Sequence, residues 1–128
     1  MDQITFEDFS KVEIRVGKVM AAENVEKSEK LIKLTVDFKN ETRSILTGVK
    51  AYGYTPEDFQ GKQFLFVTNI PYRKMMGEES QGMILAVDSP LHKSFGEASS
   101  LELPLDKQGE KKPEFIAADK LPIGSRLR

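Results

Sequence analysis

The chain has 128 residues and a mass of 14.4 kDa, a size typical of one domain with a single hydrophobic core. Its lack of cysteine excludes disulfides and thiolate metal sites, and a net charge of −1 argues against an indiscriminate nucleic-acid binder. Without a signal peptide or an apolar run of the ~20 residues that a membrane span needs, we expect a cytoplasmic protein that contacts no membrane.

The first elements are predicted to be a short helical turn and a long strand. Thr5 can cap the turn, with Asp8 three positions later. From Val12 onward apolar residues alternate with polar ones, which indicates a strand. At Gly17 the alternation slips by one position, because Val19 is the next apolar residue. A glycine at such a slip suggests a β-bulge that bends the strand.

Two further strands are expected after the polar stretch 24–29. Residues 32–38 alternate strictly between apolar and polar side chains, which predicts a strand with one buried face. The turn that follows contains Asn40, the residue there best able to adopt a left-handed backbone. A third strand, at about 43–49, is expected to pair back.

A short helix and two more strands complete the regular part. Thr55 stands at a helix N-cap, Pro56 at the first helical position and Gly61 just past the end, which predicts a single helical turn. Residues 63–69 are almost all apolar and predict a fourth strand. Residues 83–87 supply a fifth.

This order matches an all-β, five-stranded Greek-key barrel of the OB type, with its short helix between strands three and four. The barrel is expected at about 12–88 of a single domain spanning 1–128. In OB barrels the second and third strands form the ligand face, flanked by the loops that join strands one to two and four to five. Here those two loops are 24–29 and 71–80.

The last third is less regular. Proline and glycine interrupt residues 89–114, which we interpret as a long loop, solvated at 107–112. Residues 115–117 and 123–127 are predicted to form C-terminal strands that pack outside the barrel.

No catalytic or metal chemistry is indicated. The single histidine, His92, lies in the irregular segment and is expected to be an ordinary surface residue. Glu78 and Glu79 are adjacent acids in a loop, which usually just face water. The sequence has no phosphate-binding glycine loop and no nucleophile–base pair. We therefore predict a protein that is not an enzyme, with no metal and no cofactor.

Cations gather on the two loops that flank the predicted ligand face. Lys27, Lys30 and Lys33 belong to the first loop and the second strand, and Arg73 and Lys74 to the other loop. Each alone would be read as a solvated surface cation. Brought together they would repel one another, and a nucleic-acid phosphate would relieve that repulsion.

Polar and soft side chains follow the second cation pair. The Ser80 hydroxyl and the Gln81 amide suit base edges or sugar hydroxyls. Met75, Met76 and Met83 are flexible apolar side chains that could lie against a base or ribose. For Met76 and Met83 the alternative is packing into the core.

The sequence resembles the stand-alone tRNA-binding domain family from about residue 4 to 87 and again over 121–128. The matching segments are ITFEDF (4–9), KVEIRVGKV (11–19), KL (30–31), TGV (47–49), YTPED (54–58), Asn69 and RKMMGEESQGM (73–83). The family includes free-standing tRNA-binding proteins and the C-terminal domain of bacterial methionyl-tRNA synthetases. The resemblance implies an OB fold that grips the corner of tRNA by shape, and homodimers through segments outside the barrel, with 123–126 as a candidate.

Carried over to matching positions, the resemblance implies a set of RNA contacts. They are Lys30, Asn69, Arg73, Lys74, Ser80, Gln81 and Met83, to which the pattern of residues adds Lys33 and Met75. One departure is the first loop, where Val25 and Glu26 replace the family's His-Pro pair. Glu26 and Glu29 add negative charge there and weaken the expected grip on phosphate.

The leading hypothesis is a non-catalytic tRNA-binding module, either free-standing or part of a methionyl-tRNA synthetase. The alternative is a chaperone-like, export-associated protein of the same fold family that binds unfolded peptides, which an exposed apolar groove would favour. A single-stranded DNA binder would need aromatic side chains on the outer strand face. That face carries Lys33, Thr35 and Asp37 instead.

Overall fold

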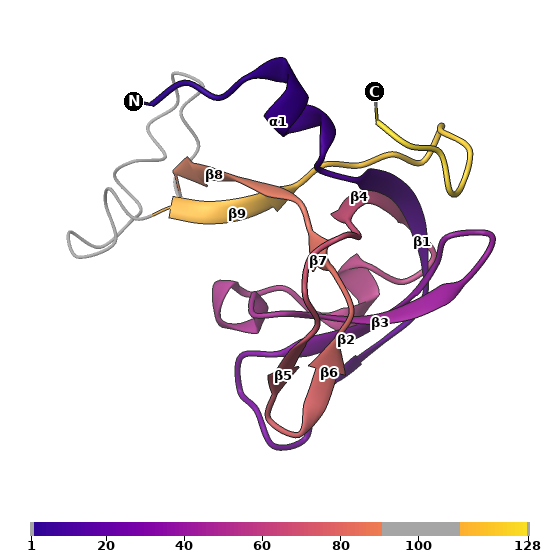
Figure 1. Cartoon of the computed structure of the whole chain (residues 1–128). Helices are drawn as coiled ribbons and strands as arrows, with labels where there is room; N and C mark the ends of the chain where they lie inside the picture. Colours follow the sequence, from indigo (N-terminus) through magenta and orange to yellow (C-terminus); the bar gives the residue numbers. More distant parts are fainter. Residues whose placement is uncertain (1, 91–110, 128) are drawn as a thin grey trace, which may run out of the picture.

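The computed structural model describes residues 2–90 and 111–127, so His92 and most of the long loop lie outside the described residues. One antiparallel sheet has the order β3-β2-β1-β4-β7 (Figure 1). Its strands are β1 (Ile14–Asn24), β2 (Ile32–Asp37), β3 (Thr42–Thr47), β4 (Gln63–Val67) and β7 (Met83–Ile84). The sheet curls until β3 meets the start of β7, where the Gln81 N–H donates to the Ser44 carbonyl at 2.7 Å. The predicted five-stranded OB barrel is confirmed.

The remaining elements surround this barrel. They are α1 (Phe6–Ser10), the 3₁₀ turns η1 (Lys50–Tyr52) and η2 (Pro56–Asp58), and the strands β5 (Arg73–Met75), β6 (Glu78–Ser80), β8 (Ala86–Pro90) and β9 (Lys111–Phe115). Among the described residues, no helix is long and apolar enough to cross a membrane. In Figure 1, α1, the β8–β9 hairpin and the C-terminal segment lie at one end of the barrel, and the β5–β6 hairpin lies at the other.

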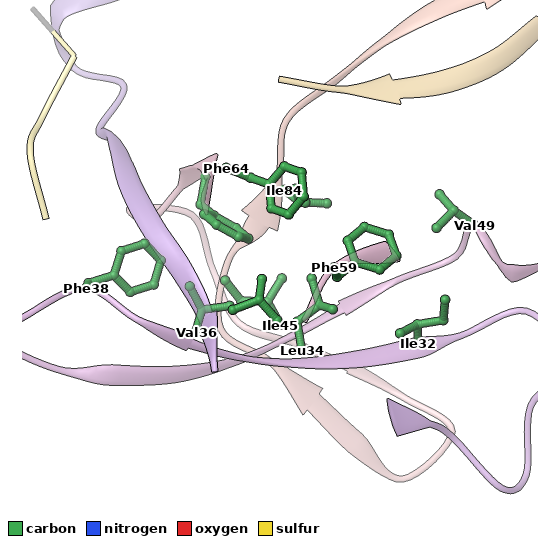
Figure 2. Packing of buried hydrophobic residues seen from close by; sticks show 11 residues of the cluster. Ile32, Leu34, Val36, Phe38, Ile45, Val49, Phe59, Phe64 and Ile84 are labelled. Carbon is green, nitrogen blue, oxygen red and sulfur yellow. The ribbon is translucent and has the colours of Figure 1, made fainter. Parts of the chain in front are cut away.

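The barrel interior is filled by the alternating apolar residues of β2 and their neighbours. Ile32, Leu34 and Val36 are completely buried, as their alternation predicts. Figure 2 shows them beside Ile45 of β3 and the ring of Phe59, which follows η2. The strict period of two along β2 therefore sets which face of the sheet forms the core.

The first half of β1, residues 14–19, is covered on both faces, which explains the slip in its sequence pattern. Gly17 and Val19 face the barrel interior. Val16 points the other way and is covered by the C-terminal segment, where its N–H donates to the Ser125 carbonyl at 2.9 Å. The predicted bulge at Gly17 is wrong, because the register shifts between Val19 and Ala21.

The turns lie at the predicted positions, but the residue that adopts the left-handed backbone differs from the prediction in one of them. The left-handed residue after β2 is Lys39, with φ of 79°, and not Asn40. Its N–H donates to the Asp37 carboxylate at 2.8 Å, which holds the turn in this form. The predicted helical turn after Thr55 is confirmed as η2, where the Thr55 N–H donates to the Asp58 carboxylate at 2.8 Å. The sequence patterns did not reveal η1.

The predicted fifth strand at 83–87 is divided. β7 pairs with β4 in the barrel, whereas β8 pairs with β9 in a separate sheet. Residues 89–90 and 111–114, predicted to be loop, therefore belong to strands. Phe115 of β9 anchors this hairpin, because its ring lies 5.1 Å from the rings of both Tyr54 and Phe59. The other predicted C-terminal strand is present as a single bridge between Arg126 and β1.

We predict that Gly17→Ala destabilises the fold. A Cβ at this position would lie 2.5 Å from a Val36 methyl carbon and 2.7 Å from the Phe38 ring. Overpacking of this kind costs roughly 1–3 kcal/mol in a packed core. Urea unfolding measures the loss. Gly48→Ala is the control, because its nearest neighbour would be 3.9 Å away, and equal stability of the two variants would contradict the packing argument.

Candidate nucleic-acid interface

Residues 71–80, predicted to be a loop, contain the β5–β6 hairpin. Met75 pairs with Glu78, which leaves the two residues Met76 and Gly77 as the connecting turn. Their φ angles are 52° and 81°. Two consecutive positive φ angles are typical of a type I′ turn, the connection that best fits the twist of a two-residue hairpin.

This hairpin is anchored on the outer face of β2 and β3. Met75 is half-buried and packs against a small cluster of three buried residues, Val25, Leu31 and Leu46. Leu46 pairs with Lys33, which places both on the outer face, away from the barrel core. Met75 therefore attaches the hairpin to the face that OB barrels use for ligands.

An ion pair adds a second attachment. The Lys33 ammonium lies 3.1 Å from the Glu78 carboxylate, so the outer face of β2 is linked to the start of β6. Both side chains are partly exposed, and the pair contributes little to stability on its own. Its consequence for binding is that the Lys33 charge is already paired with an acid.

Ser80 and Gln81 turn towards β3 and close the barrel. Ser80 is 3% exposed, and its hydroxyl accepts from the Leu46 N–H at 2.9 Å and donates to the Gly82 carbonyl at 3.0 Å. The Gln81 side-chain oxygen accepts from the Ser44 N–H at 2.9 Å. Both predicted contact residues are thus engaged in hydrogen bonds that position the hairpin.

Asn69 is also engaged internally. Its side-chain oxygen accepts from the Glu13 N–H at 2.7 Å and its amide donates to the Lys11 carbonyl at 2.6 Å. These bonds join the segment after β4 to the chain before β1. Because β1 begins beside the end of β4 and ends beside the start of β2, Asn69 and Lys30 lie at opposite ends of β1.

The two cations of β5 point in different directions. Arg73 pairs with Ser80 and shares a side of the hairpin with Met75, the side that faces the barrel. Lys74 pairs with Glu79 on the opposite side, towards solvent. Both cations are exposed, but Arg73 is the one at the edge of the ligand face.

The loop between β1 and β2 faces the hairpin across two clefts, and we call this surface the binding rim (residues 23–33 and 73–80). A cleft of about 420 Å³ is lined by Lys27 and Lys33 from one side and by Met76 and Glu78 from the other. A second, of about 620 Å³, is lined by Lys27, Lys30 and Met76. Lys30 and the hairpin therefore share one rim, as the sequence predicts.

Charges of both signs are mixed along the binding rim. The cations are Lys27, Lys30, Lys33, Arg73 and Lys74, and the acids are Glu23, Glu26, Glu29, Glu78 and Glu79. Because the formal charges cancel, the rim offers local cations without a broad positive field. Within the described residues, no group of three His, Cys, Asp or Glu side chains could hold a metal ion.

Three exposed side chains near the hairpin carry apolar surface. Met76 is 54% exposed and Met83 48% exposed, so neither packs into the core. Tyr72 is also half-exposed, with the Arg43 guanidinium 6.0 Å from its ring centre. The sequence patterns do not predict Tyr72 as a site residue. Its position directly before Arg73 is the signal that could have indicated it.

A polar network holds the end of the barrel where Asn69 lies. The Glu13 carboxylate accepts from the Arg15 guanidinium at 3.0 Å and from the Thr68 hydroxyl at 2.6 Å. The bond from Arg15, followed by that from Thr68, lowers the pKa of Glu13 from 4.5 to about 2. These bonds therefore favour the ionised carboxylate.

Comparison with known proteins identifies the family of this chain. The family described as "Putative tRNA binding domain" matches residues 14–111. Methionine–tRNA ligase of Methanoregula boonei is 49% identical over 102 residues, which cover 80% of this chain and 14% of the ligase. The ligase of Archaeoglobus fulgidus is 48% identical over 87 residues, 68% of this chain and 13% of that enzyme.

Solved structures show the same fold. A MetRS-related protein from Pyrococcus horikoshii has a TM-score of 0.80 and 33% identity, with each chain covered completely. The chaperone CsaA from Bacillus anthracis has a TM-score of 0.70 at 23% identity over 99% of this chain and all of that one, a likeness of fold alone. The chain belongs to the tRNA-binding domain family. It is related to one domain of methionine–tRNA ligases and spans only a small part of their length.

We predict that Glu13 supports the fold only above acidic pH. Its folded pKa of about 2 lies below the unfolded value of 4.5, so its contribution is complete above pH 4.5 and is lost as pH falls towards 2. Glu13→Gln lacks this titration. Unfolding free energies of both proteins, measured between pH 2 and pH 7, should therefore converge at low pH. A gap between them that stays constant would show that Glu13 ionises normally.

Proposed function

We propose that this chain binds tRNA by shape, without catalysis, through the binding rim. The observation that carries the proposal is that the β1–β2 loop and the β5–β6 hairpin meet across shared clefts, with Lys30 on one side and Met76 on the other. Family membership supports tRNA as the ligand. Because the charge of the rim is balanced, it does not attract every polyanion. It favours a ligand whose phosphates match the positions of individual cations.

The predicted contact residues take two roles in this proposal. Lys30 and Arg73 contact phosphates, and Met83 offers exposed apolar surface. Lys74 points towards solvent and makes a weaker phosphate contact. Most of the others hold the site in shape. These are Lys33, Met75, Ser80 and Gln81, whose side chains are engaged in the contacts described above. Asn69 instead holds the opposite end of β1, away from the rim.

The similarity to methionine–tRNA ligases supports a role in protein synthesis inside the cell. As part of a ligase, or recruited to an aminoacyl-tRNA synthetase, this module would keep tRNA close to a catalytic domain. Tethering of this kind raises the effective concentration of the second partner without new contacts. As a free-standing protein it would act on tRNA alone.

We further propose that the chain forms a homodimer through an apolar surface at the α1 end. α1 has no buried residue, and Phe6 is 81% exposed. Phe6, Phe9, Val12 and Leu127 surround an apolar depression of about 280 Å³. A two-fold interface needs a patch that is complementary to itself, which an apolar surface supplies. The candidate segment 123–126 pairs with β1 through its main chain, so only side chains there are available to a partner.

The depression also favours the alternative function. A chaperone-like protein needs an exposed apolar surface for unfolded peptides, and the α1 end offers one. A second copy would cover this surface, whereas a chaperone would leave it open.

We predict that Arg73→Ala weakens tRNA binding about tenfold and lowers the slope of log affinity against log salt by about one phosphate contact. Lys74→Ala should have a smaller effect, because Lys74 points away from the ligand face. Gel-shift titrations at several salt concentrations measure both. Lys120→Ala, an exposed cation in the C-terminal segment, is the control. Equal effects of all three variants would contradict the assigned rim.

We predict that Phe6→Ser converts a dimer to a monomer, because it removes the most exposed aromatic side chain of the apolar patch. Light scattering at micromolar concentration measures the mass. Met20→Ser, which changes a 53% exposed apolar residue on β1 outside this depression, should leave the dimer intact. A monomeric wild-type protein would contradict the dimer. The uncovered depression would then favour the peptide-binding alternative.

A further inference from the structure

The turn of the β5–β6 hairpin has an unexpected residue at its tip. A type I′ turn favours Asn or Gly at its first central position, because the left-handed backbone is unfavourable for most side chains. Met76 occupies that position with φ of 52°. Among the described residues, Lys39 is the other non-glycine residue with positive φ, and the Asp37 carboxylate supports its turn.

The Met76 side chain is exposed at the centre of the binding rim. It is 54% exposed and lines both clefts between the hairpin and the β1–β2 loop. Of the residues that line the larger cleft, Met76 alone comes from the hairpin, and it faces Lys27 and Lys30 there. A strained backbone that displays an apolar side chain at a binding surface points to a role in function.

The neighbours of Met76 define the chemistry of its ligand. A methionine thioether is flexible and polarisable and can lie against a flat ring or a sugar. The lysines across the cleft suit an anion. A nucleotide offers both within a few ångströms, since its phosphate adjoins the apolar faces of ribose and base.

We propose that Met76 is an RNA-contacting residue, which packs against a ribose or an unpaired base of tRNA while Lys30 meets the adjacent phosphate. This inference rests on the proposed function and assigns a contact within the same site. Because the backbone at Met76 is strained, affinity for tRNA and stability of the fold should change in opposite directions when its side chain is removed. Removing the side chain should weaken binding and, at the same time, make the protein more stable.

The experiment compares tRNA affinity with thermal stability in variants of the full chain. Met76→Asn creates the Asn-Gly pair that a type I′ turn favours, so it should raise Tm by a few degrees. The same variant should bind tRNA about tenfold more weakly, through loss of apolar contact, with an unchanged salt slope because no charge is removed. Met76→Gly should likewise lose affinity, and Met76→Leu, which keeps an apolar side chain, should restore most of it.

A matched control removes an equally exposed methionine from another place. Met20 is 53% exposed on β1 and lines neither cleft, so Met20→Asn should bind tRNA as wild type does. Wild-type affinity in both Met76→Asn and Met76→Gly would overturn the inference while leaving the proposed function intact. If the wild-type protein fails to bind tRNA, the proposed function and this inference both fall.

Discussion

The hydrogen bonds that Ser80 and Gln81 make to β3 are the constraint on which the rest of the structure depends. They join β3 to the segment before β7 at Ser44 and Leu46, and so close the barrel. The Arg43 guanidinium reinforces the same junction by donating to the Gln81 carbonyl at 3.0 Å. Because these bonds begin where β6 ends, the geometry of the barrel and the orientation of the hairpin are set together.

The sequence predicts the fold well where a strand buries one face. The alternation of β2 identifies its core residues because adjacent side chains of a strand point to opposite sides. β1 is different, since the C-terminal segment covers the face that turns away from the barrel. Burial on both faces removes the alternation, because Val16 is covered by a segment more than a hundred residues later in the chain. The local sequence pattern therefore could not show that Gly17 packs closely against Val36 and Phe38 in the interior.

For the candidate site, the sequence predicts which segments meet but not the direction of each side chain. The cations at Lys30 and Arg73 follow from loop positions in the barrel. The burial of Ser80 and the pairing of Lys33 with Glu78 depend on the register of β5 against β6 and on the contact with β3. The register of two strands cannot be predicted from a segment whose sequence pattern indicates a loop. Gly77 could nevertheless have indicated a hairpin turn at this place.

The even balance of charge on the rim has a kinetic consequence. With five cations and five acids interleaved, long-range attraction adds little to the speed at which an RNA arrives, so encounters proceed near the ordinary diffusive docking rate. Selectivity among RNAs must then come from how long each complex lasts. Under the proposed function, such a module samples many RNAs briefly and retains those whose shape matches the rim.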